Sequence, residues 1–206
     1  LIRTTTQYGK SDVTSMALLK IATTRNEKIL IVAPSAKQAS IIMGNVIDHI
    51  FDHQYFVGMI TYDGSLDRLR NEKSKTRITF RTGSEIFILT AEAHTVSQEG
   101  KNLMGFGATI VVVDESSLIP DEMFEKILRM VGGVENGKLI QLGNPFEKNH
   151  FHKAFQSKRY TKLVVNDVEA LKEGRLTERF LEEVLEELSP LAYMIQYKCL
   201  FPDGGA

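Results

Sequence analysis

The sequence has little cysteine and almost no net charge. Cys199 is the only cysteine in 206 residues, and 25 lysines and arginines nearly cancel 26 aspartates and glutamates, which leaves a net charge of −1. A single thiol excludes an internal disulfide framework and any cysteine-based metal site, as expected in a reducing compartment. The charge balance gives no global basic field for nucleic acid, although a local basic strip remains compatible with it.

Long apolar runs, repeats and targeting signals are missing as well. No run approaches the roughly 18 apolar residues of a membrane-spanning helix, and no signal-peptide pattern opens the chain. We therefore expect a soluble intracellular protein with no membrane partner. The length suits one ordinary α/β domain.

Short apolar runs alternate with helical patterns along the chain. The run at 28–34 has the signature of a parallel strand that is covered on both faces, and the apolar segments at 109–113 and 138–143 are also expected to be strands. Segments with helical periodicity follow the first two runs, and Ser35 is positioned to cap the first of these helices. This alternation predicts a doubly wound α/β fold with a mostly parallel sheet and helices on both faces.

The remaining segments are less regular. In the middle of the chain we expect a polar irregular stretch (52–75), a hairpin (76–81 and 85–90) and a loop (91–107). Toward the end we expect a last strand (160–165), a helix from about Thr177, a helix from Pro190 that Ser189 caps, and the start of a linker (202–206). We interpret the charge-dense residues 67–73 as solvated surface.

A candidate phosphate-binding loop lies at the start of the chain, in residues 3–11. Such a loop ends in Gly-Lys-Ser/Thr at a strand-to-helix turn, and Gly9, Lys10 and Ser11 fill these places. Backbone N–H groups and the helix dipole hold the phosphates, the lysine reaches the terminal phosphates, and the hydroxyl binds Mg²⁺. The usual pattern has a further glycine where this chain has Thr4. The alternative is a plain turn capped by Ser11.

The residues after this loop have helical spacing. Val13, Met16, Ala17 and Ile21 fall on one face of a helix that starts near Ser11. Leu1 and Ile2 look like the end of a buried strand, and we expect its beginning to precede the printed sequence.

Two adjacent carboxylates, Asp114 and Glu115, follow an apolar strand. An aspartate in this place holds Mg²⁺ in ATPases, opposite the serine of the loop, and a following glutamate can polarise the attacking water. Neighbouring side chains of a strand point in different directions, so each carboxylate can serve one of the two roles. The alternative is a solvated acidic turn.

Asn144 ends the strand at 138–143, where ligands bind in parallel sheets. It could contact the γ-phosphate or the attacking water and report hydrolysis to the rest of the domain, or it could simply begin an Asn-Pro turn. The five histidines have no zinc-like spacing, and His150 and His152 are expected to flank a helix start.

Taken together, the strand-end motifs resemble the ATPase domain of the large terminase subunit, the motor that packages DNA into the heads of tailed phages. The resemblance rests on residues 7–11, 31–39 and 111–115, and on Gly143-Asn144-Pro145. Segments 77–90 and 176–201 are also typical of this family. It therefore covers nearly the whole chain.

The resemblance implies an ASCE-type P-loop NTPase (RecA-like) fold with added strands over residues 1–200, followed by a linker (201–206) to a nuclease domain outside this chain. The strand that feeds the loop and an adenine-contacting segment would lie upstream. The implied activity is Mg-ATP hydrolysis that drives double-stranded DNA into a procapsid, in the host cytoplasm. The implied partners are DNA, the portal protein, the small terminase subunit and further copies in a ring.

Roles carry over to matching positions of this sequence. The implied nucleotide-binding residues are Thr6, Gln7, Tyr8, Gly9, Lys10 and Ser11; the implied Mg²⁺ ligands are Ser11 and Asp114; and the implied catalytic residues are Glu115, Lys10, Asn144 and Arg3. The family often has an arginine near Thr6, and Arg3 is the nearest one here. Another arginine commonly precedes the glycine at Gly105, where this chain has Met104, with Lys101 as the nearest cation.

Two other functions fit parts of the pattern. A helicase-like remodeller would suit the turn at 33–35, but the chain lacks a second RecA-like domain. A nucleotide-gated assembly module with weak hydrolysis would suit Thr4 and the missing arginine.

Overall fold

The computed structural model describes residues 1–62, 65–71, 76–91 and 107–202. Contacts divide the chain into two compact units. Unit 1 comprises residues 1–10, 115–121 and 141–206, and unit 2 comprises residues 11–114 and 122–140. Most of the predicted loop at 91–107, with Lys101, Met104 and Gly105, and most of the predicted linker lie outside the described residues.

A six-stranded sheet with the order β3-β4-β5-β2-β6-β7 forms the centre of unit 2. The strands are β2 (Lys28–Ala33), β3 (Ile60–Thr61), β4 (Arg77–Phe80), β5 (Glu85–Thr90), β6 (Ile110–Val113) and β7 (Lys138–Gln141). Strand β2 pairs in parallel with both β5 and β6, and its residues 29–33 are fully buried. This confirms a strand covered on both faces, as its unbroken apolar run predicts.

The predicted hairpin is confirmed at one edge of this sheet. Strands β4 and β5 are antiparallel, and the Phe80 N–H donates to the Ser84 carbonyl at 2.9 Å across the turn. Gly83 has φ +85°, a conformation that glycine adopts without a Cβ penalty. The antiparallel strand β3 extends the sheet beyond β4.

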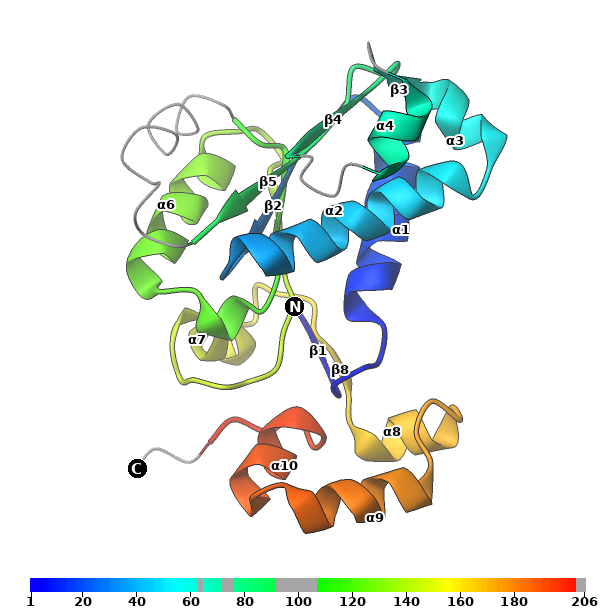
Figure 1. The fold of residues 1–206 in the computed structure, drawn as a ribbon. Coiled ribbons are helices and arrows are strands. Elements are labelled where there is room, and N and C mark those ends of the chain that lie inside the picture. Colours follow the sequence, from blue (N-terminus) through cyan, green and yellow to red (C-terminus); the bar gives the residue numbers. More distant parts are fainter. Residues whose placement is uncertain (63–64, 72–75, 92–106, 203–206) are drawn as a thin grey trace. The chain divides into compact units, whose positions relative to one another are not determined.

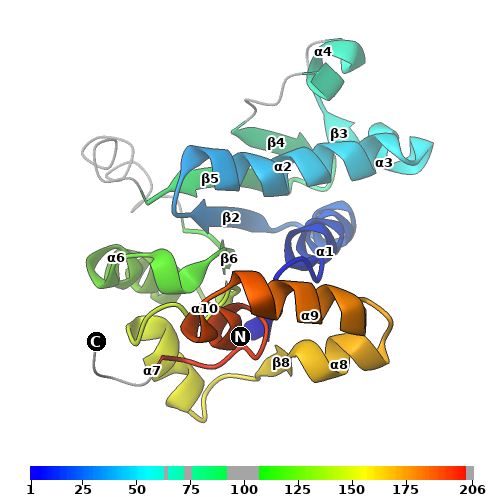
Figure 2. The ribbon, with the colours of Figure 1, turned by 60° about the horizontal axis from the view of Figure 1, so that its bottom comes forward.

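The helices of unit 2 are α1 (Lys10–Thr24, whose first residue belongs to unit 1), α2 (Ala36–Phe51), α3 (Gln54–Met59), α4 (Leu66–Asn71) and α6 (Asp121–Gly132, whose first residue also belongs to unit 1). Helix α2 packs along β2 and β5 (Figures 1 and 2). The Ser35 side chain accepts a hydrogen bond from the Gln38 N–H, which confirms the predicted cap.

The prediction that residues 52–75 are irregular is wrong for most of the described part. Helix α3, strand β3 and helix α4 occupy it. His53 caps α3 by accepting from the Tyr55 N–H. Each of these elements spans two to six residues, which is too short for an apolar periodicity to emerge from the sequence.

Helix α1 begins where the phosphate loop requires it, but the predicted apolar stripe is not its buried face. Val13 and Met16 are 63% and 52% exposed. The buried residues are instead Ser15, Leu18, Leu19, Ala22 and Thr23. The apolar spacing thus located the helix correctly, while the buried face combines leucines with small and polar residues.

Unit 1 contains a parallel pair of strands and a series of helices. The elements are β1 (Ile2–Thr4), the 3₁₀ helix η1 (Ser116–Leu118), α7 (His150–Gln156), β8 (Leu163–Val165), α8 (Asp167–Lys172), α9 (Glu178–Glu187) and α10 (Pro190–Gln196). Strands β1 and β8 pair in parallel, and Leu142 forms a single parallel bridge to Ile2. Ser189 caps α10, as the sequence predicts, and Thr177, the expected start of a helix, is the N-cap of α9.

Two apolar clusters stabilise unit 1. Helices α9 and α10 pack together (Figure 2) through a cluster around Leu181, Tyr193 and Tyr197. The other cluster joins Leu1, Phe151 and Ala154, and Phe155 and Phe201 pack against it. Complete burial of a side chain such as that of Phe151 contributes about 1.5–3 kcal/mol. None of the described helices is both long and apolar enough to cross a membrane.

Candidate functional site

The phosphate loop joins β1 to α1, which confirms the predicted strand-loop-helix order. Gln7 and Gly9 have φ values of +62° and +90°, so the chain makes two left-handed steps within three residues. Successive residues of alternating hand turn their N–H groups toward one side and create an anion-binding concavity. Gly9 therefore has a conformational reason to be glycine.

The first residues of the loop are held within unit 1. The N–H groups of Thr5 and Thr6 donate to the carbonyls of Val165 and Gln196, each at 2.9 Å. Thr4, which replaces the usual glycine, is the last residue of β1 and is 2% exposed. A β-branched residue suits a strand, so in this chain the position requires no glycine.

The two carboxylates lie directly after β6. Asp114 is 5% exposed, and its N–H donates to the Val32 carbonyl at 2.8 Å. Glu115 adopts a left-handed conformation (φ 44°, ψ 48°), which turns the chain sharply into η1. Strand β6 ends at Val113, so the strand alternation expected from the sequence does not apply to the two carboxylates.

Gly143 makes room for this turn. It has φ +147°, and a Cβ atom at this position would lie 3.0 Å from the Glu115 Cα and 3.1 Å from the Ser116 nitrogen. The Ser116 N–H donates to the Leu142 carbonyl at 2.8 Å. The chain before Asn144 therefore approaches the Glu115 turn more closely than a residue with a Cβ atom ordinarily does.

Asn144 connects the phosphate loop with the Glu115 turn. Its Oδ1 accepts from the Lys10 Nζ at 3.2 Å, and its backbone N–H donates to the Glu115 Oε2 at 3.4 Å. Its Nδ2 donates to the carbonyls of Thr4 (3.3 Å) and Gln196 (3.1 Å), and the residue is 3% exposed. The Asn144 amide is thus fixed by both of its ends. Unit 1 brings together three predicted site residues, Lys10, Glu115 and Asn144.

The predicted Mg²⁺ ligands, Ser11 and Asp114, both belong to unit 2. Ser11 lies in the first turn of α1. A hydroxyl and a carboxylate are hard oxygen donors of the kind that Mg²⁺ prefers, so the donor set fits this ion. Among the described residues, no group of three histidine, cysteine, aspartate or glutamate side chains could hold a metal ion.

Arg3 and Tyr8 lie elsewhere in unit 1. The guanidinium of Arg3 stacks over the rings of Phe155 (4.4 Å) and Phe201 (5.1 Å), and burial lowers the pKa of Arg3. The hydroxyl of Tyr8 donates to Glu173, which follows α8. Among the described residues, the contacts found for the Arg3 guanidinium are with the rings of Phe155 and Phe201, and none joins it to Lys10, Glu115 or Asn144.

Sequence reasoning missed a buried polar network beside Glu115. His150 Nδ1 lies 2.8 Å from Asp121 Oδ1, and His150 Nε2 lies 3.2 Å from the Ser116 hydroxyl. The sequence indicated only that His150 and His152 flank a helix start, and in the structure both lie in the first turn of α7, which begins at His150. The only local signal was a serine directly after the Asp-Glu pair, which is too common to single out.

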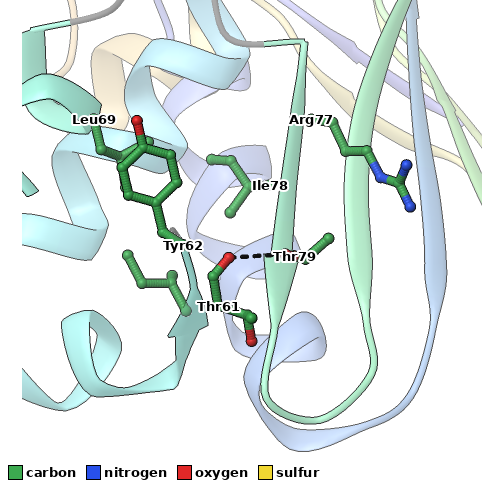
Figure 3. A pocket seen from close by; sticks show the side chains of 7 residues that line it. Thr61, Tyr62, Leu69, Arg77, Ile78 and Thr79 are labelled. Carbon is green, nitrogen blue, oxygen red and sulfur yellow. Dashed lines mark hydrogen bonds between the residues drawn. The ribbon is translucent and has the colours of Figure 1, made fainter. Parts of the chain in front are cut away.

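Two pockets in unit 2 involve none of the predicted site residues. One, of about 250 Å³, lies between β3, β4 and α4, and Figure 3 shows Tyr62, Leu69 and Ile78 gathered around it. Thr79 donates to the Thr61 carbonyl at 2.9 Å in its wall, while Arg77 points away and pairs with Glu85. The other, of about 820 Å³, is a mostly apolar groove between α1, the end of α2 and α3.

Comparison with known proteins gives one family and several similar structures. The sequence matches the family described as the terminase large subunit, T4likevirus-type, N-terminal, over residues 1–206. No curated protein sequence matches the chain.

The large terminase ATPase domain of Thermus phage P74-26 is 17% identical, with a TM-score of 0.74 over 98% of this chain and 88% of that chain. The large terminase of a thermophilic bacteriophage is 14% identical, with a TM-score of 0.70 over 97% of this chain and 47% of that chain. The HK97 large terminase is 16% identical, with a TM-score of 0.61 over 80% of this chain and 34% of that chain. These likenesses confirm the predicted P-loop NTPase fold.

Proposed function

We propose that this chain, which belongs to the T4-type family of large terminase subunits and matches their N-terminal region, hydrolyses Mg-ATP to drive double-stranded DNA into a procapsid. The observation that carries the proposal is the position of Asn144. It bonds to the lysine of the phosphate loop and to the glutamate after β6, the two groups that act on the terminal phosphate in P-loop enzymes.

Nucleotide binding would fall to residues 6–11. The left-handed steps at Gln7 and Gly9 turn backbone N–H groups toward one side, and the N-terminus of α1 adds its dipole. Lys10 would neutralise the terminal phosphates. Structures of one similar large terminase were solved in complex with ADP and with ATP-γ-S.

Hydrolysis would use the carboxylates after β6. In this proposal Glu115 polarises the attacking water, while Ser11 and Asp114 hold Mg²⁺, which would neutralise the charge that develops on the phosphates. Arg3 remains our candidate for the cis-acting arginine, and this role would require its guanidinium to leave Phe155 and Phe201.

Asn144 would couple hydrolysis to movement. A phosphate that attracts Lys10 competes with the Asn144 Oδ1 for the same ammonium protons. The Nδ2 of Asn144 holds the carbonyl of Gln196 at the end of α10. A change at the phosphate can therefore reach the C-terminal helices through one side chain.

The remaining parts of the proposal follow from the family. The chain would form the ATPase domain (residues 1–200) of a longer protein, whose nuclease domain would follow the linker at 201–206 and whose adenine-contacting segment would precede Leu1. It would act in the host cytoplasm as a ring on the portal protein, with the small terminase subunit and DNA as partners.

The test is ATP turnover by the full-length protein with DNA and portal protein present. We expect Lys10→Ala and Glu115→Gln to lower kcat by a factor on the order of 10² or more. Glu182→Gln, on the exposed face of α9, is the matched control and should turn over ATP like wild type. Turnover by Lys10→Ala and Glu115→Gln at the wild-type rate would contradict the catalytic assignment.

Two further measurements on the same components, duplex unwinding and retention of bound nucleotide, separate the two alternatives. Strand separation would identify a helicase, since a packaging motor moves along an intact duplex. Nucleotide that stays bound without turnover would identify an assembly module. Thr4 gives that alternative no support, because it belongs to strand β1.

A further inference from the structure

Three buried polar side chains and one exposed carboxylate form a row beside the Glu115 turn. Asp121 Oδ1 lies 2.8 Å from His150 Nδ1, His150 Nε2 lies 3.2 Å from the Ser116 Oγ, and the Ser116 Oγ lies 2.9 Å from the Gln141 Oε1. Ser116 and Gln141 are fully buried, and His150 is 7% exposed. Because such groups are costly to bury unless they are paired, this row needs a reason to exist.

Hydrogen-bond geometry fixes the tautomer of His150. Asp121 Oδ1 accepts from the backbone N–H of His150 at 3.0 Å and from its Nδ1–H at 2.8 Å. These bonds lower the pKa of Asp121, which is therefore an ionised acceptor. Burial outweighs this carboxylate and lowers the pKa of His150. The ring is thus neutral near pH 7, with its proton on Nδ1 and an accepting lone pair on Nε2.

The Ser116 hydroxyl has a single proton, and this limits which hydrogen bonds of the row can form together. The Ser116 hydroxyl donates to the Gln141 Oε1 at 2.9 Å, and His150 Nε2 lies 3.2 Å from the same hydroxyl as a second acceptor for its proton. Gln141 would donate to the Ser116 oxygen if its amide were reversed. Its Nε2 is buried and has no hydrogen-bond partner among the described residues, and a half-turn of the amide would bring this nitrogen to Ser116.

The row stabilises a turn whose backbone conformation is unfavourable by itself. The left-handed conformation of Glu115 costs roughly 1–2 kcal/mol and persists only where neighbours enforce it. Ser116, its direct neighbour, is held by its N–H to Leu142 and by its hydroxyl to His150. Ser117 extends the restraint, because its Oγ donates to the Asn144 carbonyl at 2.6 Å.

We propose that Asp121 and His150 act through Ser116 as positioning residues that hold the Glu115 carboxylate in the direction required for hydrolysis. The inference rests on the proposed function of Glu115. It assigns a catalytic purpose to a histidine and an aspartate that lie outside the phosphate-binding and metal-binding motifs.

Two substitutions of His150 separate its hydrogen bond to Asp121 from its hydrogen bond to Ser116. The amide of His150→Asn replaces Nδ1 and keeps the bond to Asp121, whereas the amide of His150→Gln replaces Nε2 and keeps the bond to Ser116. Steady-state turnover by the full-length protein with DNA and portal protein gives kcat and KM for ATP, and calorimetry gives the unfolding midpoint.

We expect His150→Asn and Ser116→Ala to lower kcat by roughly 10-fold to 100-fold with KM for ATP within about twofold of wild type, because the phosphate loop is untouched. His150→Gln should recover much of the lost kcat. His152→Asn, on the same helix but outside the row, is the matched control and should leave kcat unchanged.

A double substitution tests whether the row acts on turnover through the Glu115 carboxylate. In Glu115→Gln protein, adding Ser116→Ala should cause no further loss of residual turnover, because the carboxylate that the row positions is already gone. Additive losses would overturn the proposal, as would wild-type kcat in His150→Asn, or equal loss of activity in all variants in proportion to a lowered unfolding midpoint. Failure of the proposed function has a different signature, in which Glu115→Gln itself turns over ATP like wild type.

Discussion

At the scale of single residues, the site depends on backbone conformations that few residue types adopt. Glu115 and Gly143 both have positive φ, and they approach each other across the turn that precedes Asn144. The sequence indicated the chemistry of Glu115 and Asn144 through their place after apolar strands. It gave no indication that Gly143 is required by a contact, because that contact joins segments far apart in the chain.

Gly143→Ala should destabilise the protein by about 1–3 kcal/mol, because the new Cβ would meet the Glu115 backbone at 3.0 Å in a left-handed conformation. Urea unfolding measures the change. Gly44→Ala is the control: this glycine lies within α2 with open space around it, and alanine there should raise stability by roughly 0.5–1 kcal/mol. Equal effects of the two substitutions would refute the steric argument.

The His150 row shows the limit of prediction at this scale. Asp121, Ser116 and His150 belong to three different helices, and their meeting depends on tertiary packing. Spacing rules for metal sites and catalytic motifs do not describe such a row. A sequence can therefore suggest candidate substrate-contacting residues more readily than residues whose contacts depend on tertiary packing.

At the scale of elements, the sequence predicted where helices begin better than it predicted which of their faces are buried. Ser35 and Ser189 cap their helices as expected, because a cap needs only one side chain and the next turn of backbone. The buried face of α1 and the presence of α3 and α4 were missed. These depend on what lies opposite the helix, which a single segment does not encode.

His49 links two helices of unit 2. Its Nε2 lies 2.8 Å from Asp12 on α1, and its Nδ1 lies 3.1 Å from Asp52 at the end of α2. Burial would lower the pKa of His49, but its hydrogen bonds to Asp52 and Asp12 outweigh this effect and raise the pKa above its ordinary value.

A raised pKa means that folding favours the protonated ring. The stabilisation by His49 should be complete below pH about 6.5, the ordinary pKa of histidine, and should disappear as the pH rises through the higher folded-state pKa. The unfolding midpoints of wild type and His49→Gln should therefore converge between neutral and alkaline pH. A difference that grows as the pH rises would contradict this sign.

At the scale of the whole molecule, fold class was predictable and the arrangement of contacts was not. Alternating apolar strands and helices were sufficient to predict the α/β class, and similar folds occur in chains only 14% and 17% identical. Composition added little, because a net charge near zero is compatible with many functions.

Nucleotide should stabilise the folded chain if the proposed function is correct. With Mg²⁺ and a slowly hydrolysed ATP analogue at about 100 times its Kd, linkage gives roughly 2.7 kcal/mol. This corresponds to an increase in the unfolding midpoint on the order of 5–10 °C for a chain of this size. Calorimetry measures the shift.

Removal of the metal with a chelator should reduce this shift, and Lys10→Ala should nearly abolish it. Glu182→Gln should shift like wild type. An identical shift in Lys10→Ala would show that the nucleotide binds outside the phosphate loop.

The left-handed backbone at Glu115 also has a consequence for how this sequence can drift. A glycine or asparagine would occupy that conformation at lower cost, so selection for stability alone would replace the glutamate. In lineages where ATP turnover no longer matters, we expect this position to change early and the buried residues around it to change late. Under the proposed function, retention of the glutamate at this position therefore indicates continued selection for ATP turnover.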